Sequence, residues 1–193
     1  VLIGYLLALA GSQNGVSYAG IPLFTLSVGF AFLIQWLVFI PAYLLQTEKF
    51  FDLTGSLTYI SVIVLAVALS TGIDQRSFLL SALVVIWAVR LGSFLFRRIQ
   101  KAGKDGRFDE IKPSFIRFLN VWTIQGLWVT FTMAAALVAI TSSNHKELDA
   151  FAIIGLLIWI FGFAIEVTAD SQKSRFSANP ENKGKFIQTG LWS

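Results

Sequence analysis

The chain has 193 residues, of which 55% are hydrophobic and only 13% are charged. A soluble domain is typically about 45–50% apolar and about 25% charged, so this composition excludes an ordinary water-soluble fold and indicates an integral membrane protein. The formal net charge of +4 gives no support to nucleic-acid binding, and the lack of cysteine excludes disulfides and thiolate metal sites. The single histidine, His145, lies in a short polar segment where we expect it to be solvated, which argues against a zinc or haem site.

Six apolar segments follow one another along the chain, and a helix that crosses a bilayer needs about 20 such residues. The first, residues 1–10, is a partial span, because the sequence begins inside it. The other spans are predicted at residues 21–45, 57–71, 78–96, 115–141 and 150–168. Short polar or glycine-rich connections separate them, as antiparallel neighbours require. The sequence therefore predicts an all-α, polytopic transmembrane helix bundle that forms a single membrane domain over residues 1–193, incomplete at both ends.

Basic residues are distributed unequally between the two sides that this alternation of spans defines. One side collects Lys49, the bases of residues 97–117 and those of residues 173–185, whereas the other collects only Arg76 and Lys146. Cytoplasmic loops carry such an excess of lysine and arginine. The pattern predicts that the first residues, the 97–117 loop and the last residues are cytoplasmic. A bacterial inner membrane, the endoplasmic reticulum and a plastid membrane would each fit as the host membrane.

Arg90 interrupts the apolar sequence VVIWAVRLGSFLF, where a charge costs about 2.5–3.5 kcal/mol on insertion scales. Its side chain could extend to the cytoplasmic interface, because it lies about two turns from that end of its helix. We prefer the interpretation that it pairs with an acid inside the bundle. Glu166 and Asp170 are the candidate partners, since their helix ends on the same side and a spacing of four residues puts both on one helix face.

Polar side chains elsewhere suggest where a site would form. Gln125 and, more weakly, Gln35 place an amide in an apolar span, either as an interhelical hydrogen bond worth about 0.6 kcal/mol or as part of a site. The bases of residues 97–117 would either hold that loop against anionic lipid headgroups or attract a cofactor phosphate. We expect this loop to share one membrane face with residues 47–59 and 166–192. That arrangement predicts a pocket for a lipid-like substrate beneath a charged cofactor.

Four ordered blocks of sequence resemble the steroid 5α-reductase-like family of uncharacterised multi-span membrane proteins. They are TEKFFDLTGSLTY, WAVRLGSFLFRRI, GKDGRFDEIK and GFAIEVTADSQKSRF…GLWS. The resemblance covers residues 47–193 and implies the C-terminal-like domain of the 3-oxo-5-alpha-steroid 4-dehydrogenases. In those reductases, NADPH at the cytoplasmic face delivers a hydride to the alkene carbon of an enone. The resemblance also implies that a further cofactor-binding motif follows Ser193.

The resemblance implies cofactor-binding roles for four residues near the end of the last span. Asp170 matches an acid that helps to hold the cofactor, and Glu166 stands where the reductases carry an asparagine. Lys173 and Arg175 are implied to neutralise the cofactor phosphate. NADPH is therefore the expected cofactor.

The resemblance also implies a catalytic role for Asp52, Trp87 and Arg90, which fall near the blocks that shape the steroid pocket. The Gln-Glu pair and the tyrosine of that pocket are not evident in this sequence. The resemblance therefore indicates a reductase without assigning a steroid as its substrate.

Three functions remain open at this point. The leading hypothesis is an NADPH-dependent reductase of an unsaturated lipid, steroid-like or isoprenoid-like ketone. A second is an S-adenosylmethionine-dependent methyltransferase, because membrane methyltransferases share the C-terminal fold that the resemblance implies. The third is a catalytically silent family member that serves as a lipid- or pigment-contacting subunit of a larger membrane complex. The expected partners are a lipid-like small molecule and membrane lipids.

Overall fold

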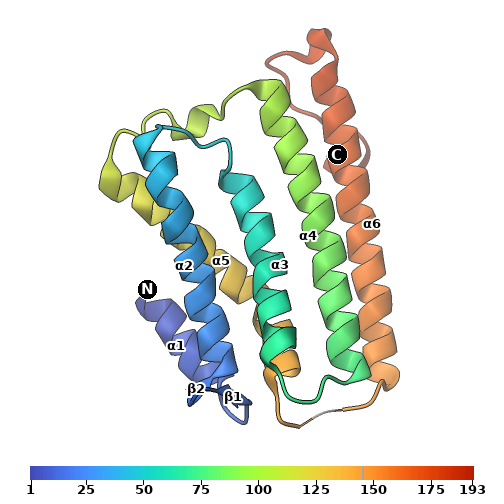
Figure 1. Cartoon of the computed structure of the whole chain (residues 1–193). Helices are drawn as coiled ribbons and strands as arrows, with labels where there is room; N and C mark the ends of the chain where they lie inside the picture. The colour runs from blue at the N-terminus through green and yellow to red at the C-terminus, as the bar shows by residue number, and fades with distance from the viewer. Residues whose placement is uncertain (145) are drawn as a thin grey trace. The chain divides into compact units, whose positions relative to one another are not determined.

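The computed structural model describes residues 1–144 and 146–193 (Figure 1). The expectation for His145 therefore lies outside the described residues. The structure confirms the all-α fold class. Its helices are α1 (Leu2–Gly11), α2 (Leu23–Leu44), α3 (Phe51–Leu69), α4 (Gln75–Ala102), α5 (Phe115–Thr141) and α6 (Ala150–Ala178). Five of the described helices, α2 to α6, are long and apolar enough to cross a membrane, as a multi-pass membrane protein requires.

The chain divides into two compact units, Val1–Glu147 and Leu148–Ser193. The first unit contains α1 to α5, the short 3-10 helix η1 (Gly106–Phe108) and a hairpin of β1 (Ser17–Tyr18) and β2 (Ile21–Pro22). The second contains α6 and the 3-10 helices η2 (Pro180–Asn182) and η3 (Gly190–Trp192). That the whole chain acts as a single membrane domain stays a prediction.

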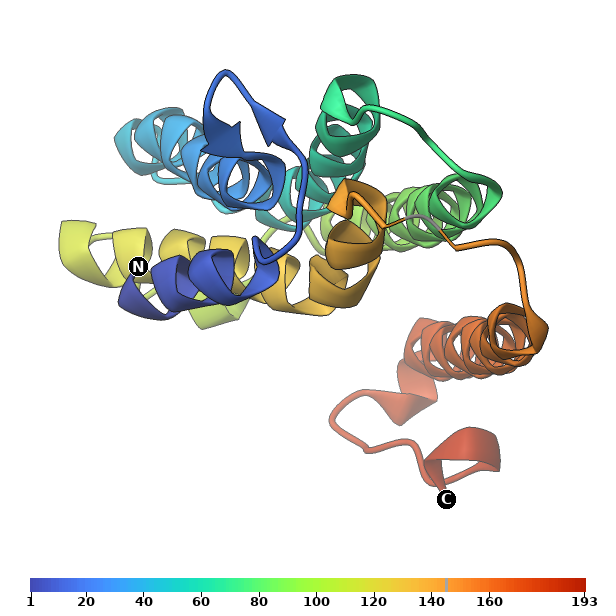
Figure 2. The same ribbon diagram turned by 90° about the horizontal axis from the view of Figure 1, so that it is seen from below.

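The core of the first unit lies around α3 and α5. Helix α3 packs against α2, α4 and α5, while α5 also packs against α1, which lies beside it in Figure 2. The side chains enclosed there are large and apolar. Fully buried examples are Phe24, Ile63, Met133, Leu137 and Ile140. Because lipid tails are as apolar as these side chains, close packing is what selects this arrangement of helices.

Glycine allows two close approaches between these helices. A Cβ atom at Gly92 of α4 would lie 2.6 Å from the Cβ of Ser56 on α3, so only a residue without a side chain permits this contact. Gly55 makes room in the same way for the Gln125 amide of α5, whose Nε2 would lie 2.6 Å from a Cβ there. Small residues are typical of such close interhelical contacts in membranes.

Several helices extend beyond the apolar segments that predict them. Helix α3 begins at Phe51 instead of residue 57, and α6 continues to Ala178 instead of ending at 168. Hydropathy marks only the apolar part of a helix, whereas hydrogen bonding sets its ends. In α3 the Thr54 and Thr58 hydroxyls each donate to the backbone carbonyl four residues earlier, both at 2.7 Å. These threonines therefore satisfy their polar groups without ending the helix.

Candidate functional site

A buried ion pair joins the two loops at one end of the first unit. Glu48, which precedes α3 and is 4% exposed, forms an ion pair with Lys112 and accepts a second hydrogen bond from the backbone N–H of Asp105 at 2.8 Å. Burial would raise the pKa of the Glu48 carboxyl, but the hydrogen bonds from Lys112 and Asp105, with the charge of Lys112, hold that pKa below its usual value. The carboxylate thus fastens the segment before α3 to the loop after α4.

Asp52, a predicted catalytic residue, belongs to the same end of this unit. It lies in the first turn of α3, and its Oδ2 is 3.1 Å from a guanidinium nitrogen of Arg98 on α4. Lys104 pairs with Asp109 at 2.7 Å, and Arg107 pairs with Asp105. We call these residues, with Glu48 and Lys112, the ion-pair cluster. Four bases of the 97–117 segment are therefore paired with acids of their own unit, and the pairs of Arg98 and Lys112 join this segment to residues 48–52.

Aromatic side chains fill the space beneath the ion-pair cluster. Phe108 of η1 is 7% exposed, and its ring centroid lies 5.1 Å from that of Phe51 and 6.2 Å from that of Phe118. Trp122 completes the group, with its ring 5.1 Å from Phe51. The loop after α4 is thus anchored by an apolar side chain as well as by charge.

Trp87 and Arg90, the other predicted catalytic residues, lie on α4 at greater depth than Asp52. The Trp87 ring packs edge-on against Tyr59 of α3, with the ring centroids 4.9 Å apart. The Arg90 guanidinium carbon lies 5.3 Å from the ring centroid of Phe94, a distance typical of a cation–π contact. Arg98, the partner of Asp52, is eight residues beyond Arg90, about 12 Å along the helix axis. The three predicted residues therefore lie at different heights along α3 and α4.

Helical geometry groups three of the four predicted cofactor-binding residues. Glu166, Asp170 and Lys173 are at positions i, i+4 and i+7 of α6 and so share one face, whereas Arg175 lies about 180° around the axis from Glu166. The predicted pairing of Arg90 with Glu166 or Asp170 would join the two units and stays a prediction.

The chain after α6 folds back onto the helix beside this face. We call residues 179–193 the hook. The indole N–H of Trp192 donates to the Ala169 carbonyl at 3.0 Å, and the Leu191 N–H donates to the Gln172 side chain at 2.9 Å. The ammonium group of Lys173 lies 4.8 Å from the ring centroid of Trp192. The end of the hook is thereby fixed next to Asp170 and Lys173.

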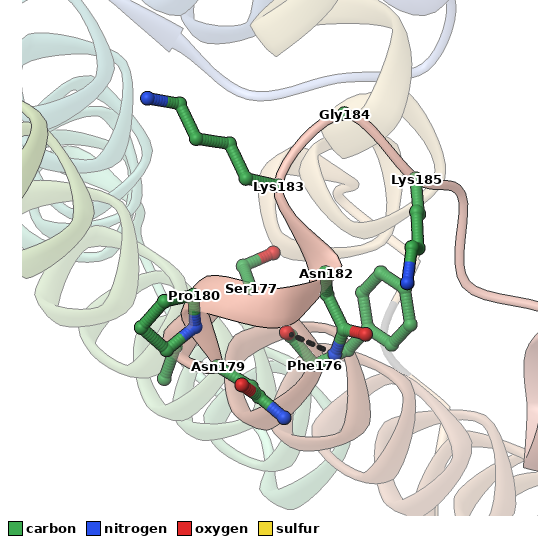
Figure 3. Close-up of a pocket in the computed structure, with 9 residues that line it drawn as sticks. Phe176, Ser177, Asn179, Pro180, Asn182, Lys183, Gly184 and Lys185 are labelled. Atoms are coloured by element: carbon green, nitrogen blue, oxygen red, sulfur yellow. Dashed lines mark hydrogen bonds between the residues drawn. The ribbon is translucent and has the colours of Figure 1, made fainter.

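A polar pocket of about 430 Å³ lies where the hook leaves α6 (Figure 3). It is lined by Phe176, Ser177, Ala178, Asn179, Pro180, Asn182, Lys183, Gly184 and Lys185. Figure 3 shows Lys183 and Lys185 on either side of Gly184, where the chain turns with a φ of 79°. The Asn182 amide donates to the Phe176 carbonyl at 2.9 Å and so fixes the turn against the end of α6.

The lysines and amides of this pocket are absent from the predicted site. The signal that could have found them is the sequence NPENKGK, in which turn-forming residues alternate with lysine directly after a helix. Such a segment places two lysines on one tight turn, and Figure 3 shows their ammonium groups pointing to different sides of it. Over the described ranges 1–144 and 146–193, no three His, Asp or Glu side chains are grouped as metal ligands. The two lysines that line the pocket are cationic donors, which suit an anionic group.

Comparison with known families finds a match for most of this chain. Residues 38–193 match the family described as a protein of unknown function, DUF1295. No curated protein and no solved structure matches. The matched region includes α3 to α6, the ion-pair cluster and the hook, and it extends over most of the chain. The chain therefore belongs to the DUF1295 family.

Proposed function

We propose that this protein is a membrane-embedded, NADPH-dependent reductase of an unsaturated lipid, steroid-like or isoprenoid-like ketone. The proposal adds to family membership the resemblance of residues 47–193 to steroid 5α-reductase-like proteins. The observation that carries it is the lysine-lined pocket of the hook, which is continuous with the α6 segment that bears the predicted cofactor-binding face.

The chemistry of these side chains suits the different parts of NADPH. Lys183 and Lys185 offer ammonium donors to phosphate oxygens, and charge-assisted bonds of this kind are the strong ones. Asp170 and Glu166 offer carboxylate oxygens to ribose hydroxyls or to a carboxamide N–H. Four bases of the 97–117 segment already face acids, so the hook is the better candidate for the phosphate. When bound, NADPH would supply the hydride.

Asp52, Trp87 and Arg90 are the proposed substrate-side residues. A guanidinium group at the position of Arg90 would donate a hydrogen bond to a ketone oxygen and stabilise negative charge there as the alkene is reduced. Trp87 would offer its ring to an apolar ligand, since its edge-on contact with Tyr59 fixes its orientation. Asp52, held by Arg98, would contribute mainly by positioning the end of α3.

Nucleotide binding by the purified full-length protein in lipid nanodiscs tests the proposal. We expect NADPH to bind and to quench tryptophan fluorescence, because Trp192 lies against Lys173. The Lys183→Gln/Lys185→Gln variant should bind about tenfold more weakly or worse, since a hydrogen bond to a charged group contributes about 1.5–3 kcal/mol. Asp170→Ala should also lower affinity while membrane insertion stays intact.

The matched control is Lys49→Gln/Lys101→Gln, which removes two exposed lysines of the first unit and should bind NADPH like the wild type. A wild-type protein that neither binds NADPH nor oxidises it with any enone lipid would overturn the proposal. Clear preference for S-adenosylmethionine in the same titration would indicate the methyltransferase instead. Stable co-purification with a membrane complex, without affinity for either nucleotide, would indicate the structural subunit.

A further inference from the structure

Among the described residues, the buried polar atoms of the first unit that have no hydrogen-bond partner include Gln35 Oε1, Gln125 Oε1 and Trp122 Nε1. Gln35 and Trp122 are both 0% exposed. The two amide nitrogens are already used, since Gln35 Nε2 donates to the Thr58 hydroxyl at 2.8 Å and Gln125 Nε2 donates to the Phe51 carbonyl at 3.1 Å. Two acceptors and one donor are therefore left over.

Exchanging the oxygen and the nitrogen of the Gln35 amide does not give every polar atom a partner. The Thr58 hydroxyl already donates its proton to the Thr54 carbonyl at 2.7 Å, so it can only accept from Gln35. An inverted amide would place two acceptor oxygens against each other and leave the Gln35 nitrogen without an acceptor. The unused hydrogen-bonding capacity is thus a property of this part of the bundle, whichever way the amide is assigned.

The three residues belong to one seam between α2, α3 and α5. Trp122 and Gln125 are three residues apart on α5, within a single turn, and both contact Phe51. Gln35 packs against the next residue of α5, since a Cβ at Gly126 would lie 3.3 Å from Gln35 Cγ. We call Gln35, Gln125 and Trp122, with Thr58, the polar seam.

Unpaired polar atoms are costly in this position. Helices α2, α3 and α5 have the length and composition of membrane spans, so no bulk water reaches their contacts. A buried polar group without a partner costs roughly 1–3 kcal/mol even in soluble proteins. Buried groups of this kind are normally satisfied by an ordered water molecule that makes about three hydrogen bonds.

We propose that the polar seam holds at least one ordered water molecule, which donates to the amide oxygens of Gln35 and Gln125 and accepts from Trp122 Nε1. The number of O–H protons decides between the candidate guests. A water molecule has two protons for the two oxygens and still accepts from the indole. The hydroxyl of a lipid has one proton and would leave one amide oxygen unpaired, and a ketone has none. This site is independent of the proposed cofactor site.

X-ray hydroxyl-radical footprinting of the full-length protein in nanodiscs tests this assignment. Irradiation generates radicals from water in place, so an enclosed side chain is oxidised only where a water molecule lies next to it. We expect Trp122 to be oxidised well above Phe118, which is equally buried but lies among aromatic rings, after correction for intrinsic reactivity. The Gln35→Met/Gln125→Met variant should lower oxidation of Trp122 several-fold, whereas Gln13→Met, at an exposed position, should not change it.

The wild-type comparison decides the question even where the double variant fails to insert. Oxidation of Trp122 no greater than that of Phe118 in the wild type would overturn the proposal. Oxidation that appears only after the bound lipid has been extracted would also overturn it, because a lipid hydroxyl would then have occupied the seam. Oxidation of Trp122 in both preparations, reduced in the double variant, supports the water molecule.

Discussion

The two compact units of this protein are held together in different ways. The first has a continuous apolar core, in which side chains as large as Phe118, Trp122 and Ile140 are completely buried. In the second, the contacts of α6 within the unit are with η2 and η3, and hydrogen bonds and a cation–π contact of the hook fix them. Packing therefore stabilises the first unit, whereas directional contacts between few side chains shape the second.

Because of this difference, we expect the rigid part of the protein and the part that binds a ligand to lie in different units. Ligand-binding segments are often drawn from the less stable part of a protein, because polar groups that are fully used in packing cannot also contact a ligand. The pocket with the two lysines lies in the unit that has the fewer apolar contacts. We therefore expect the first unit to change little when a ligand binds and the hook to respond to it.

Removing a core side chain should give the largest difference between the units. Phe24, which is 1% exposed, packs inside the first unit, whereas Phe186 of the hook is 89% exposed. We expect Phe24→Ala to lower the free energy of unfolding by about 3 kcal/mol, the lower end of such substitutions, because lipid instead of water surrounds the unfolded helices. Phe186→Ala should cause no measurable loss. Equal effects in a detergent unfolding titration would contradict the division into a packed and an unpacked unit.

The buried ion pair should have the next largest effect. Glu48→Gln would leave the ammonium group of Lys112, 13% exposed, without its counter-charge. We expect a loss of about 2 kcal/mol, less than the roughly 3–5 kcal/mol for a deeply buried pair, since some solvent reaches Lys112. Lys104→Gln, which breaks an exposed pair of the same loop, is the control and should resemble the wild type. If Glu48→Gln unfolded like the wild type, the ion pair would contribute nothing to the free energy of unfolding.

The same pair predicts how stability depends on pH. Because the folded pKa of Glu48 lies below its ordinary value of 4.5, its contribution is complete above that pH and is lost as the pH falls through the folded pKa. Melting temperatures at about pH 7 and about pH 3 should therefore differ more in the wild type than in Glu48→Gln. The carboxyls of Asp105 and Asp109, whose pKa values are also lowered, remain in the variant and should account for the residual dependence. Identical pH dependences would exclude Glu48 as a contributor.

The smallest effect should come from loosening the hook. Trp192→Phe removes the indole N–H that donates to the Ala169 carbonyl but keeps an aromatic ring near Lys173. We expect a local change of about 0.5–1.5 kcal/mol, seen as faster amide exchange of residues 183–193. Exchange in α2 to α5 should stay unchanged. Faster exchange throughout the first unit would contradict the separation between the two parts.

The sequence predicts the helices better than it predicts the candidate functional site. Apolar runs predict all six helices, because lipid requires continuous apolar surface and internal backbone hydrogen bonds. The partner of Glu48 could not be predicted, since Lys112 is 64 residues away and no local pattern relates them. The position of Arg175 on the opposite side of α6 from Glu166 could have been predicted, because it follows from the helical period alone. The pocket of the hook depends on a turn at Gly184, which the sequence signals only through its turn-forming residues.

Gly92 constrains how α4, the helix that carries Arg90, packs against α3. The contact with Ser56 sets the rotation of α4 about its own axis, since any side chain at Gly92 would force the helix to roll or to move away. Arg90 lies about 160° around α4 from Gly92. Arg90 therefore supplies the charge, whereas a different residue, Gly92, sets the position of the helix that carries it. A variant such as Gly92→Ala would keep every functional group of the chain and still present Arg90 at the wrong angle, so a search for important positions that considers only reactive side chains would overlook it.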